Sequence, residues 1–592
     1  MNAEANTSYT VNRALKLMMP PTIFSALVLA FLDMADVLIV TNIYGTDGLV
    51  IASVFLPVIY FSYALFNGIG YGGSNLFAYY IGRKEHDEAR KVFYSVAFAG
   101  FAIALIFTAA GLFFFDFIAD LLLGIEITSN PGNASLVNGV RCYGAWILAG
   151  LPITALKLIL TYFVRVDNNP GLAMYVLIIQ AAINIFFDLF FMKVLNTGPQ
   201  GAAMALGLSQ TAAFAILLLH FRKPCAAFSF GFLVPGRDRL VKIMRYSVNA
   251  IGDNIYDPIV MFVFNGLVLR QFGIDEASIF FVVMYCYSFV TVLGDGMEES
   301  LSPLQGIFHG ESDKMAVIMT TYRGIFIGVT AGIILTAFLL AYPGAVAWMY
   351  GFENPGLMEK CSFAVRMFSL SIPFAILNGL MANAYQAIDR PFNAFFISFA
   401  RGFAVLLASG CFALIIKSEF LFRQTFIITE IIVLILWIAL ALWMKKKQNK
   451  ESLLLLDSEE PDYAGYLYLM LEPGTLKLSE YQNTLSQFLN KHGVEEKKIH
   501  YAVLGLEEIA LYADWRKGNS KFSFIDSRTA VQKDGSVKFI AKFEAAAEDL
   551  MLKIKADREA DEDYIGMKLL YKISSRFEYT CIMGFNCLDI IF

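Results

Sequence analysis

Long apolar runs separated by short polar breaks extend from about residue 14 to residue 444. About 20 consecutive apolar residues are enough for a helix to cross the hydrocarbon core of a bilayer, and a helix satisfies its own backbone hydrogen bonds there. The pattern therefore predicts an all-α polytopic membrane protein with twelve transmembrane helices. Their approximate limits are residues 14–42, 47–81, 92–115, 140–164, 172–194, 199–221, 240–272, 277–308, 317–344, 361–387, 392–416 and 422–444.

The prolines of this region repeat between its two halves. Pro152 recurs 221 positions later as Pro373, and Pro170 recurs at the same offset as Pro391. This matched spacing predicts two homologous six-helix bundles in the same orientation, related by an axis along the membrane normal. Transport folds with such repeats bind their cargo between the halves. The expected bundles are residues 1–221 and 222–444.

The apolar pattern ends at residue 444, and ordinary soluble composition follows it. The whole chain is 57% hydrophobic and only 16% charged, whereas an average soluble protein carries about 25% charge. Residues 445–461 form a basic, polar linker, and residues 462–592 are expected to fold as a C-terminal cytoplasmic α/β two-layer sandwich. The net charge of −5 gives no indication of nucleic-acid binding, and the seven cysteines lack the spacing of a metal site.

Lysine and arginine are unevenly distributed between the two sets of loops. When the N-terminus is placed in the cytoplasm, the inner segments carry almost three times as many of these residues as the outer loops. Positively charged loops stay in the cytoplasm, so both termini and the soluble tail are expected there. The first residues lack the basic region and cleavage site of a secretory signal. We therefore expect a multi-pass protein of the plasma (cell inner) membrane whose first apolar run is retained.

Acidic and amide side chains interrupt two of the apolar runs. Asn184 and Asp188 are four residues apart, so they lie on one face of a helix. Asp33 and Asp36 show a similar spacing in the first run. A carboxylate at the centre of a membrane helix costs about 2.5–3.5 kcal/mol on the insertion scale, so we expect these groups to face a cavity or a partner. Such carboxylates can exchange their charge for a proton or a sodium ion.

Several segments of the first half form an ordered set of motifs: Asp36–Gly45, Gly70–Asn75, Gly82–Lys84 with Ala89, Val164–Pro170, Asn184–Asp188 and Gly201–Ala203. In order and spacing they resemble the multidrug and toxic compound extrusion (MATE) family of antiporters. The resemblance implies a proton or sodium site formed by Asp36, Asn184 and Asp188, which would be the metal ligands if sodium is the coupling ion; no other cofactor is implied. Asp33 has no counterpart in the family and is either a second coupling carboxylate or the partner of a nearby donor.

The second half carries acidic residues of its own. Asp253 and Asp257 are four residues apart in the seventh run, and Glu298 lies in the eighth run beside Asp295 and Glu299. A cluster of acids attracts cationic molecules, so Asp257, Glu298 and Asp253 are candidates for contact with cargo in a cavity. The alternative is that the acids of the eighth run are simply hydrated at the end of their helix.

The tail combines strand and helix patterns in the order of an α/β domain. It resembles the anti-sigma-factor type of histidine-kinase-like ATPase, through Glu507 and Glu508 on one helix and Gly566 at the start of a later one. The resemblance implies a nucleotide site at these residues. Strands are expected at residues 463–471, 537–543, 577–582 and 586–591, the last two as a hairpin turning at Gly584, and helices at residues 478–491, 495–512 and 564–575.

Key residues of that ATPase family are missing from the tail. The family needs an asparagine four residues after its catalytic acid to hold magnesium, but Leu511 and Tyr512 stand there. It also needs an Asp-x-Gly turn for adenine, and no glycine follows Asp557 at that spacing. We therefore expect a degenerate domain that has lost ATP hydrolysis. It would sense a ligand, bind a regulatory protein, or persist without a role.

These patterns together predict a secondary active transporter and not an enzyme. We expect a monomer, surrounded by membrane lipids and without a nucleic-acid partner, that exports drugs and other amphipathic organic cations against proton or sodium entry. A lipid or lipid-linked oligosaccharide flippase of the same superfamily is an alternative, but it would require a strongly basic cavity. A membrane-tethered ATPase or signalling protein is another, and it would require the missing magnesium asparagine. An inactive transporter relic is disfavoured by the Asp36, Asn184 and Asp188 set.

Overall fold

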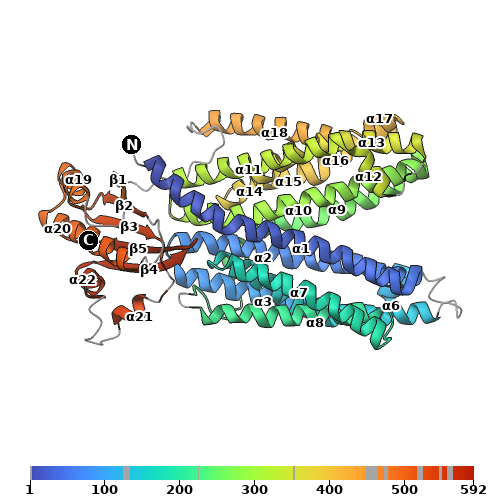
Figure 1. Cartoon of the computed structure of the whole chain (residues 1–592), viewed down its shortest axis with the longest axis horizontal. Coiled ribbons are helices and arrows are strands. Elements are labelled where there is room, and N and C mark those ends of the chain that lie inside the picture. Colours follow the sequence, from blue (N-terminus) through green and yellow to red (C-terminus); the bar gives the residue numbers. More distant parts are fainter. Residues whose placement is uncertain are drawn as a thin grey trace.

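The computed structural model joins an elongated bundle of helices to a C-terminal unit built on a β-sheet. Figure 1 shows this unit, called the tail below, at one end of the bundle, beside the N-terminus of the first helix. We call that end of the bundle the tail side. The structure describes residues 3–123, 134–223, 226–350, 352, 354–448, 463–471, 478–516, 524–545, 548, 550–555 and 564–592.

The first half of the bundle contains long helices that run between the tail side and the opposite end. Among the described residues of the whole chain, ten helices are long and apolar enough to cross a membrane. The helices of this half are α1 (Ala3–Val54), α2 (Leu56–Gly82), α3 (His86–Phe113), α4 (Phe115–Leu123), α6 (Ala134–Val166), α7 (Pro170–Leu189), η2 (Phe190–Val194), α8 (Gln200–Leu217) and η3 (Leu218–Arg222).

The second half repeats this arrangement. Its helices are α9 (Arg237–Phe272), α10 (Ile274–Gly310), α11 (Lys314–Ala341), α12 (Pro343–Met349), α13 (Pro355–Ser369), α14 (Ile372–Ala387), α15 (Pro391–Phe399), η4 (Ala400–Ala404), α16 (Val405–Ile415), α17 (Glu419–Phe422) and α18 (Thr425–Gln448). Equivalent turns share a rare left-handed backbone: Lys84 and Ser312 have φ of 64° and 60°, and Asn168 and Asp389 have φ of 56° and 58°. Because non-glycine residues seldom adopt positive φ, this agreement supports an internal repeat.

The first two helices depart from the expected boundaries. We expected a break at residues 42–47, but α1 continues to Val54. The break falls at Phe55, directly before a helix that has Pro57 in its first turn, a position where the missing N–H of proline costs nothing. At the equivalent place in the second half the chain does turn, at Gly273 with φ of 86°.

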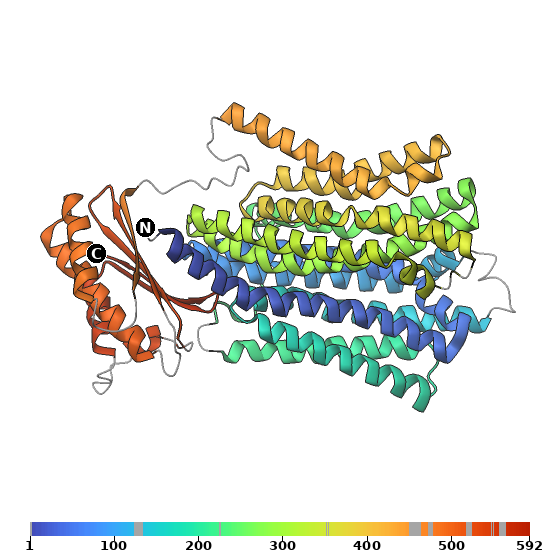
Figure 2. The ribbon, with the colours of Figure 1, turned by 45° about the horizontal axis from the view of Figure 1, so that its top comes forward.

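The tail is a five-stranded antiparallel sheet in the order β1-β2-β3-β5-β4. Helices α19, α20 and α22 pack on one face of the sheet, and the bundle lies on the other side, as Figure 2 shows. The elements are β1 (Tyr463–Leu471), α19 (Leu478–Lys491), α20 (Glu496–Arg516), β2 (Ile525–Gln532), β3 (Val537–Phe543), α21 (Leu550–Lys555), α22 (Ile565–Ile573), β4 (Arg576–Ile582) and β5 (Phe585–Ile591).

Ion pairs join the tail to a tail-side loop of the second half, and a hydrogen bond joins it to α1 of the first half. Arg528 of β2 pairs with Asp313, before α11, and Lys542 of β3 pairs with Glu311. In the first half, Thr10 of α1 donates a hydrogen bond to Asp526 at 2.9 Å. All of these side chains are buried, so water competes little for them.

The hairpin of β4 and β5 inserts its tip into the bundle. Ile582, Met583, Phe585 and Cys587 belong to the same buried apolar cluster as the membrane helices. At the tip, the Gly584 N–H donates to Asn168 Oδ1 at 2.6 Å. The tail therefore packs on the bundle through a continuous apolar core as well as through charges.

Candidate functional site

Three polar side chains predicted to act together lie in contact inside the first half. The Asn184 amide nitrogen donates to Asp36 Oδ1 at 2.8 Å and to Asp188 Oδ2 at 2.9 Å. Ser209 of α8 donates to Asn184 Oδ1 at 2.9 Å. Asn184 and Asp188 are fully buried, because their spacing places both on the face of α7 that packs against α1 and α8. We call these four residues the N-half network.

The orientation of the Asn184 amide bears on which ion this network could hold. Two carboxylates accept from its nitrogen, and a hydroxyl donates to its oxygen, so the amide acts as a donor toward both acids. A sodium ion would instead need the amide oxygen among its hard oxygen ligands. The observed arrangement suits two carboxylates that share a proton, and it would have to rotate to bind sodium. The side chain of Asp33 lies outside the described residues.

A cavity of about 370 Å³ lies between the two halves. Its walls carry five carboxylates and two basic side chains, together with the tyrosines Tyr63, Tyr71 and Tyr162. Aromatic faces and carboxylates both attract organic cations. The charged residues of the wall are Asp36, Asp253, Asp295, Glu298, Glu299, Lys157 and Arg165.

Asp36 connects this cavity to the N-half network. Its carboxylate lines the cavity and also accepts the hydrogen bond from Asn184. The Asp36 side chain therefore belongs both to the cavity wall and to the network.

The predicted acids of the second half gather around a basic residue. Asp253 and Glu298 line the cavity, while Asp257 lies deeper and accepts from the Tyr287 hydroxyl at 3.1 Å. The Glu298 carboxylate and the Arg401 guanidinium converge at Gly379, where an added Cβ would lie 2.5 Å and 3.2 Å from them. Glycine at this position therefore gives the two charged groups the space to meet.

The sequence analysis missed Glu430, which is buried in α18. Arg401 Nε donates to Glu430 at 2.7 Å, and the Asn378 amide donates to its other oxygen at 2.7 Å. Trp437 donates in turn to Asn378 at 2.8 Å. A single glutamate in the apolar sequence Thr-Glu-Ile-Ile-Val-Leu was the available signal, since a buried charge requires a partner.

The two halves touch backbone to backbone on the tail side of the cavity. An added Cβ on Gly82 would lie 2.1 Å from the Ile307 carbonyl oxygen, and one on Gly310 would lie 2.2 Å from the Tyr79 carbonyl oxygen. Gly82 and Gly310 occupy equivalent positions of the repeat. Only glycine allows helices α2 and α10 to approach this closely, so the cavity is closed toward the tail in this conformation.

The predicted nucleotide residues of the tail lie together on α20 and α22. The Glu508 carboxylate fills the space beside Gly566, where an added Cβ would lie 1.8 Å from its Oε2. Burial and the neighbouring Glu507 raise the pKa of Glu508, and Glu507 itself accepts from Gln482 at 3.0 Å. Asp557 lies outside the described residues. Within the described part of the chain, no group of three histidine, cysteine or acidic residues is arranged to hold a metal ion.

Part of the chain is similar to proteins of the MATE group in sequence. Residues 21–190 match the MatE family model. Multidrug export protein MepA of Staphylococcus aureus strain MRSA252 is 22% identical over 370 residues, which cover 60% of this chain and 76% of MepA. MepA of Staphylococcus haemolyticus is 20% identical over 363 residues, with the same two coverages.

Solved structures extend the similarity to the whole bundle. A MATE protein in its bent conformation has 18% identity and a TM-score of 0.65 over 76% of this chain and 100% of its own. A MOP superfamily transporter from Pyrococcus furiosus, described as having a binding pocket of reversed polarity, has 18% identity and a TM-score of 0.66 over 76% and 99%. The first half of the chain is thus similar to the MatE family, and the helical bundle has the fold of the MATE transporters.

Proposed function

We propose that this protein is a secondary active transporter that exports amphipathic organic cations, including drugs, in exchange for an ion entering the cell. Asp36 is the observation that carries the proposal, because one carboxylate belongs to both the cargo cavity and the N-half network. Protonation of the network would remove the charge that attracts the cargo cation, and deprotonation would restore it. Competition between the proton and the cargo cation for the Asp36 carboxylate is sufficient to couple their transport.

The coupling ion that we favour is the proton. The Asn184 amide presents its donor nitrogen to both carboxylates, which is the arrangement expected for a shared proton. Sodium coupling is the alternative, and it predicts an Asn184 amide turned to present its oxygen.

The direction of transport follows from the orientation in the membrane. We propose that α2 and α9 cross the membrane together with the ten apolar helices, which makes twelve. They have fewer apolar residues because they face each other and the cavity. The excess of lysine and arginine supports a cytoplasmic location for the tail side. The conformation is then closed to the cytoplasm, and cargo leaves from the opposite end.

The charge of the cavity distinguishes this function from that of a flippase. Phosphorylated lipid-linked cargo requires a basic cavity, whereas five carboxylates and two basic residues line this one. An excess of acid favours cationic cargo. We therefore do not favour lipid-linked oligosaccharides as the substrate.

Efflux of ethidium from everted vesicles, under proton and sodium gradients imposed separately, tests the proposal. We expect wild-type efflux to follow the proton gradient, and we expect Asp36→Asn and Asp188→Asn to abolish it, because neither amide can take up a proton. Asp87→Asn is the matched control, since the Asp87 side chain is 84% exposed at the start of α3; it should transport like the wild type. Unchanged efflux in both network variants, at normal protein levels, would refute the coupling role.

For the tail, we propose a regulatory domain that resembles the anti-sigma-factor ATPases but does not hydrolyse ATP. The absence of the magnesium asparagine supports this, and so does the Glu508 carboxylate, which already occupies the space beside Gly566. The purified full-length chain should show no ATPase activity above that of a Glu507→Gln, Glu508→Gln variant. Magnesium-dependent hydrolysis that the double variant loses would show that the nucleotide site is intact.

A further inference from the structure

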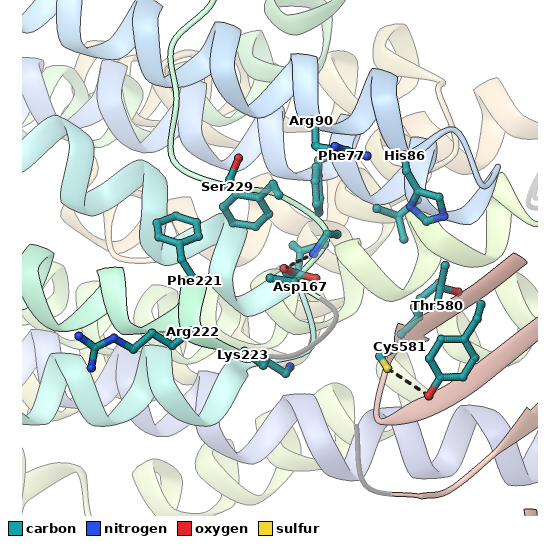
Figure 3. A pocket seen from close by; sticks show the side chains of 17 residues that line it. Phe77, His86, Arg90, Asp167, Phe221, Arg222, Lys223, Ser229, Thr580 and Cys581 are labelled. Carbon is teal, nitrogen blue, oxygen red and sulfur yellow. Dashed lines mark hydrogen bonds between the residues drawn. The ribbon is translucent and has the colours of Figure 1, made fainter. Parts of the chain in front are cut away.

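A second cavity, of about 650 Å³, lies where the tail meets the first half of the bundle. One wall comes from the tail-side ends of α2, α3, α6 and η3, and the other from Tyr579–Ile582 of β4. Figure 3 shows His86 and Arg90 of α3, together with Thr580 and Cys581 of β4, around this space. The volume is within the range of small-molecule sites, about 300–1,000 Å³. We call this space the seam cavity.

Basic side chains predominate in the seam cavity. Arg90, Arg222 and Lys223 line it, and among the residues that the structure describes Asp167 supplies the single lining carboxylate. Asp167 is already engaged, because its Oδ2 accepts from His220 Nε2 at 2.8 Å and from the Ala227 N–H at 2.9 Å. Basic side chains therefore outnumber acidic ones in the lining, in contrast to the acidic central cavity. Arg90 also pairs with Asp87 at 3.2 Å, and Lys223 donates to the Asn168 carbonyl at 2.8 Å.

Two further features indicate where a ligand would contact the wall. The Nε2 atom of His86 is shielded from solvent and has no hydrogen-bond partner among the residues that the structure describes, which is costly unless a bound group supplies one. The rings of Phe221 and Phe228 on the bundle side and of Tyr579 on the tail side add aromatic surface to the cavity. The site thus combines positive charge, a buried polar atom in need of a partner, and aromatic surface.

We propose that the seam cavity binds an organic anion that carries a phosphate group. Phosphate oxygens are suitable acceptors for arginine and lysine, and the aromatic wall accommodates an organic body that inorganic phosphate lacks. Such a ligand would be either a soluble phosphate ester of the cytosol or the headgroup of an anionic phospholipid. This site is separate from Glu507 and Glu508, which lie on the helices that cover the other face of the sheet.

The two walls belong to different units, so binding is linked to docking of the tail. A ligand that contacts both walls binds the docked form more tightly, and it stabilises that form by mass action. The docked tail is held by Glu311 and Asp313 of the second half as well as by Lys84 and Asn168 of the first half. Occupancy of the seam cavity would therefore hold the two halves together on the tail side.

Binding of ADP in the absence of magnesium, measured by calorimetry on the purified full-length chain, tests the soluble ligand. Nanodiscs of phosphatidylglycerol, compared with nanodiscs of phosphatidylcholine, test the lipid. The second readout is hydrogen exchange at residues 576–582, which either ligand should slow. We expect the Arg90→Gln, Lys223→Gln double variant to bind at least tenfold more weakly than the wild type. Arg90→Gln alone should weaken binding by a smaller factor, because the Arg90 side chain is half-exposed.

Matched variants show whether binding depends on the seam cavity itself. Lys91→Gln changes the neighbouring lysine of α3, which pairs with Glu88 and does not line the cavity, so it should bind like the wild type. Glu508→Gln should also do so. Arg528→Ala removes a docking contact outside the cavity and should weaken binding at least tenfold. Failure of both ligands to bind the wild type would overturn the proposal. Wild-type affinity in the Arg90→Gln, Lys223→Gln double variant or in Arg528→Ala would also overturn it. None of these readouts depends on transport.

Discussion

At the scale of single residues, two sets of buried charged side chains in the bundle have specific protein partners. Asp36 and Asp188 share the Asn184 amide, and Arg401 pairs with Glu430. The two clusters differ in chemistry, because the first contains two acids and no base. The first can therefore change its charge by binding one proton, while in the second a base, Arg401, already balances the charge of Glu430. This difference is the reason why we propose ion exchange in the first half and a structural role for the Arg401–Glu430 pair.

Substitution of Glu430 should destabilise the bundle. Glu430→Gln leaves the Arg401 guanidinium without its carboxylate, and removal of one partner of a buried ion pair typically costs about 3–5 kcal/mol. We expect a clearly lower midpoint in thermal unfolding, and partial recovery in the Glu430→Gln, Arg401→Gln double variant. Glu85→Gln is the control, because the Glu85–Arg83 pair is exposed and surface pairs contribute little. Equal midpoints for Glu430→Gln and Glu85→Gln would contradict this view.

The same residues show what sequence reasoning can and cannot find. The spacing of Asn184 and Asp188 predicted their contact, because residues four apart on a helix share a face. Asp36 lies 148 positions from Asn184, and only the family resemblance brought the two together. Glu430 was missed because its own helix contains no second polar residue at a helical spacing that would mark a site. Its partner Arg401 lies on a different helix. Their functional roles remain predictions.

At the scale of secondary-structure elements, the β4–β5 hairpin shows how the tail is attached. The Gly584 backbone has φ of 80°, and an added Cβ would lie 2.9 Å from Leu17 Cδ2 of α1. The backbone conformation of the turn and the close contact with Leu17 therefore both require glycine at position 584. The hairpin at Gly584 was expected from the sequence, but its insertion into the bundle was not.

A valine at position 584 should release the tail. Gly584→Val combines a positive φ, which costs about 1–3 kcal/mol, with a collision against Leu17. We expect faster hydrogen exchange in β4 and β5 and at the start of α1. Gly535→Val is the matched control, because Gly535 has φ of 76° in the β2–β3 turn and an added Cβ there meets no atom within 4 Å. It should lower the stability of the tail while α1 remains protected. Equal protection of α1 in both variants would refute the docking role of the tip.

Strand β2 was absent from the sequence analysis for a physical reason. Its sequence, Ile-Asp-Ser-Arg-Thr-Ala-Val-Gln, carries charged residues at two alternate positions, Asp526 and Arg528, which suggests one solvent-exposed face. Seven of its eight residues are buried, because the face with Asp526 and Arg528 is covered by the bundle. In sequence, a charged strand face that packs against another unit looks the same as a charged face that is exposed to water. By contrast, β1 and β3 match the expected ranges.

At the scale of the whole molecule, the tail bridges the two halves of a repeat. It contacts the loop at Lys84 in the first half and the loop at Glu311–Asp313 in the second, and these loops are equivalent in the repeat. Transporters with two such halves alternate access by moving one against the other. Because the tail contacts equivalent loops of both halves, it must lose its contacts with one half when the bundle opens on the tail side.

Docking of the tail should be constant near neutral pH and should weaken in acid. Burial raises the pKa of the Glu311 carboxyl, but Lys542 and Lys84 outweigh burial and hold the pKa below its ordinary value of 4.5. Docking therefore favours ionised Glu311; its contribution is complete above about pH 5, and it is lost as the pH falls through the lowered pKa. The pKa of Lys84 is raised above its ordinary 10.5, so its contribution is lost only in strong base.

A spin-label pair at Asp87 and Lys497, in a Cys142→Ser background, reports this equilibrium as a distance. We expect one docked distance from pH 5 to 9 and a growing second population below about pH 4.5. Glu311→Gln should dock more weakly at neutral pH and should change less in acid. A docked fraction that falls between pH 8 and pH 6 would contradict the assignment to Glu311.

The tail is covalently continuous with the last helix of the second half, yet its hairpin tip is embedded in the first half. A short tether gives a local concentration of the tail on the order of millimolar. Even a weak interface between the tail and the bundle would then be docked most of the time, and it would still dissociate readily. Cleavage of the chain between residues 449 and 462 would replace that local concentration with the bulk one. The severed domain would then dissociate at dilution, and it would rebind only when added back in excess.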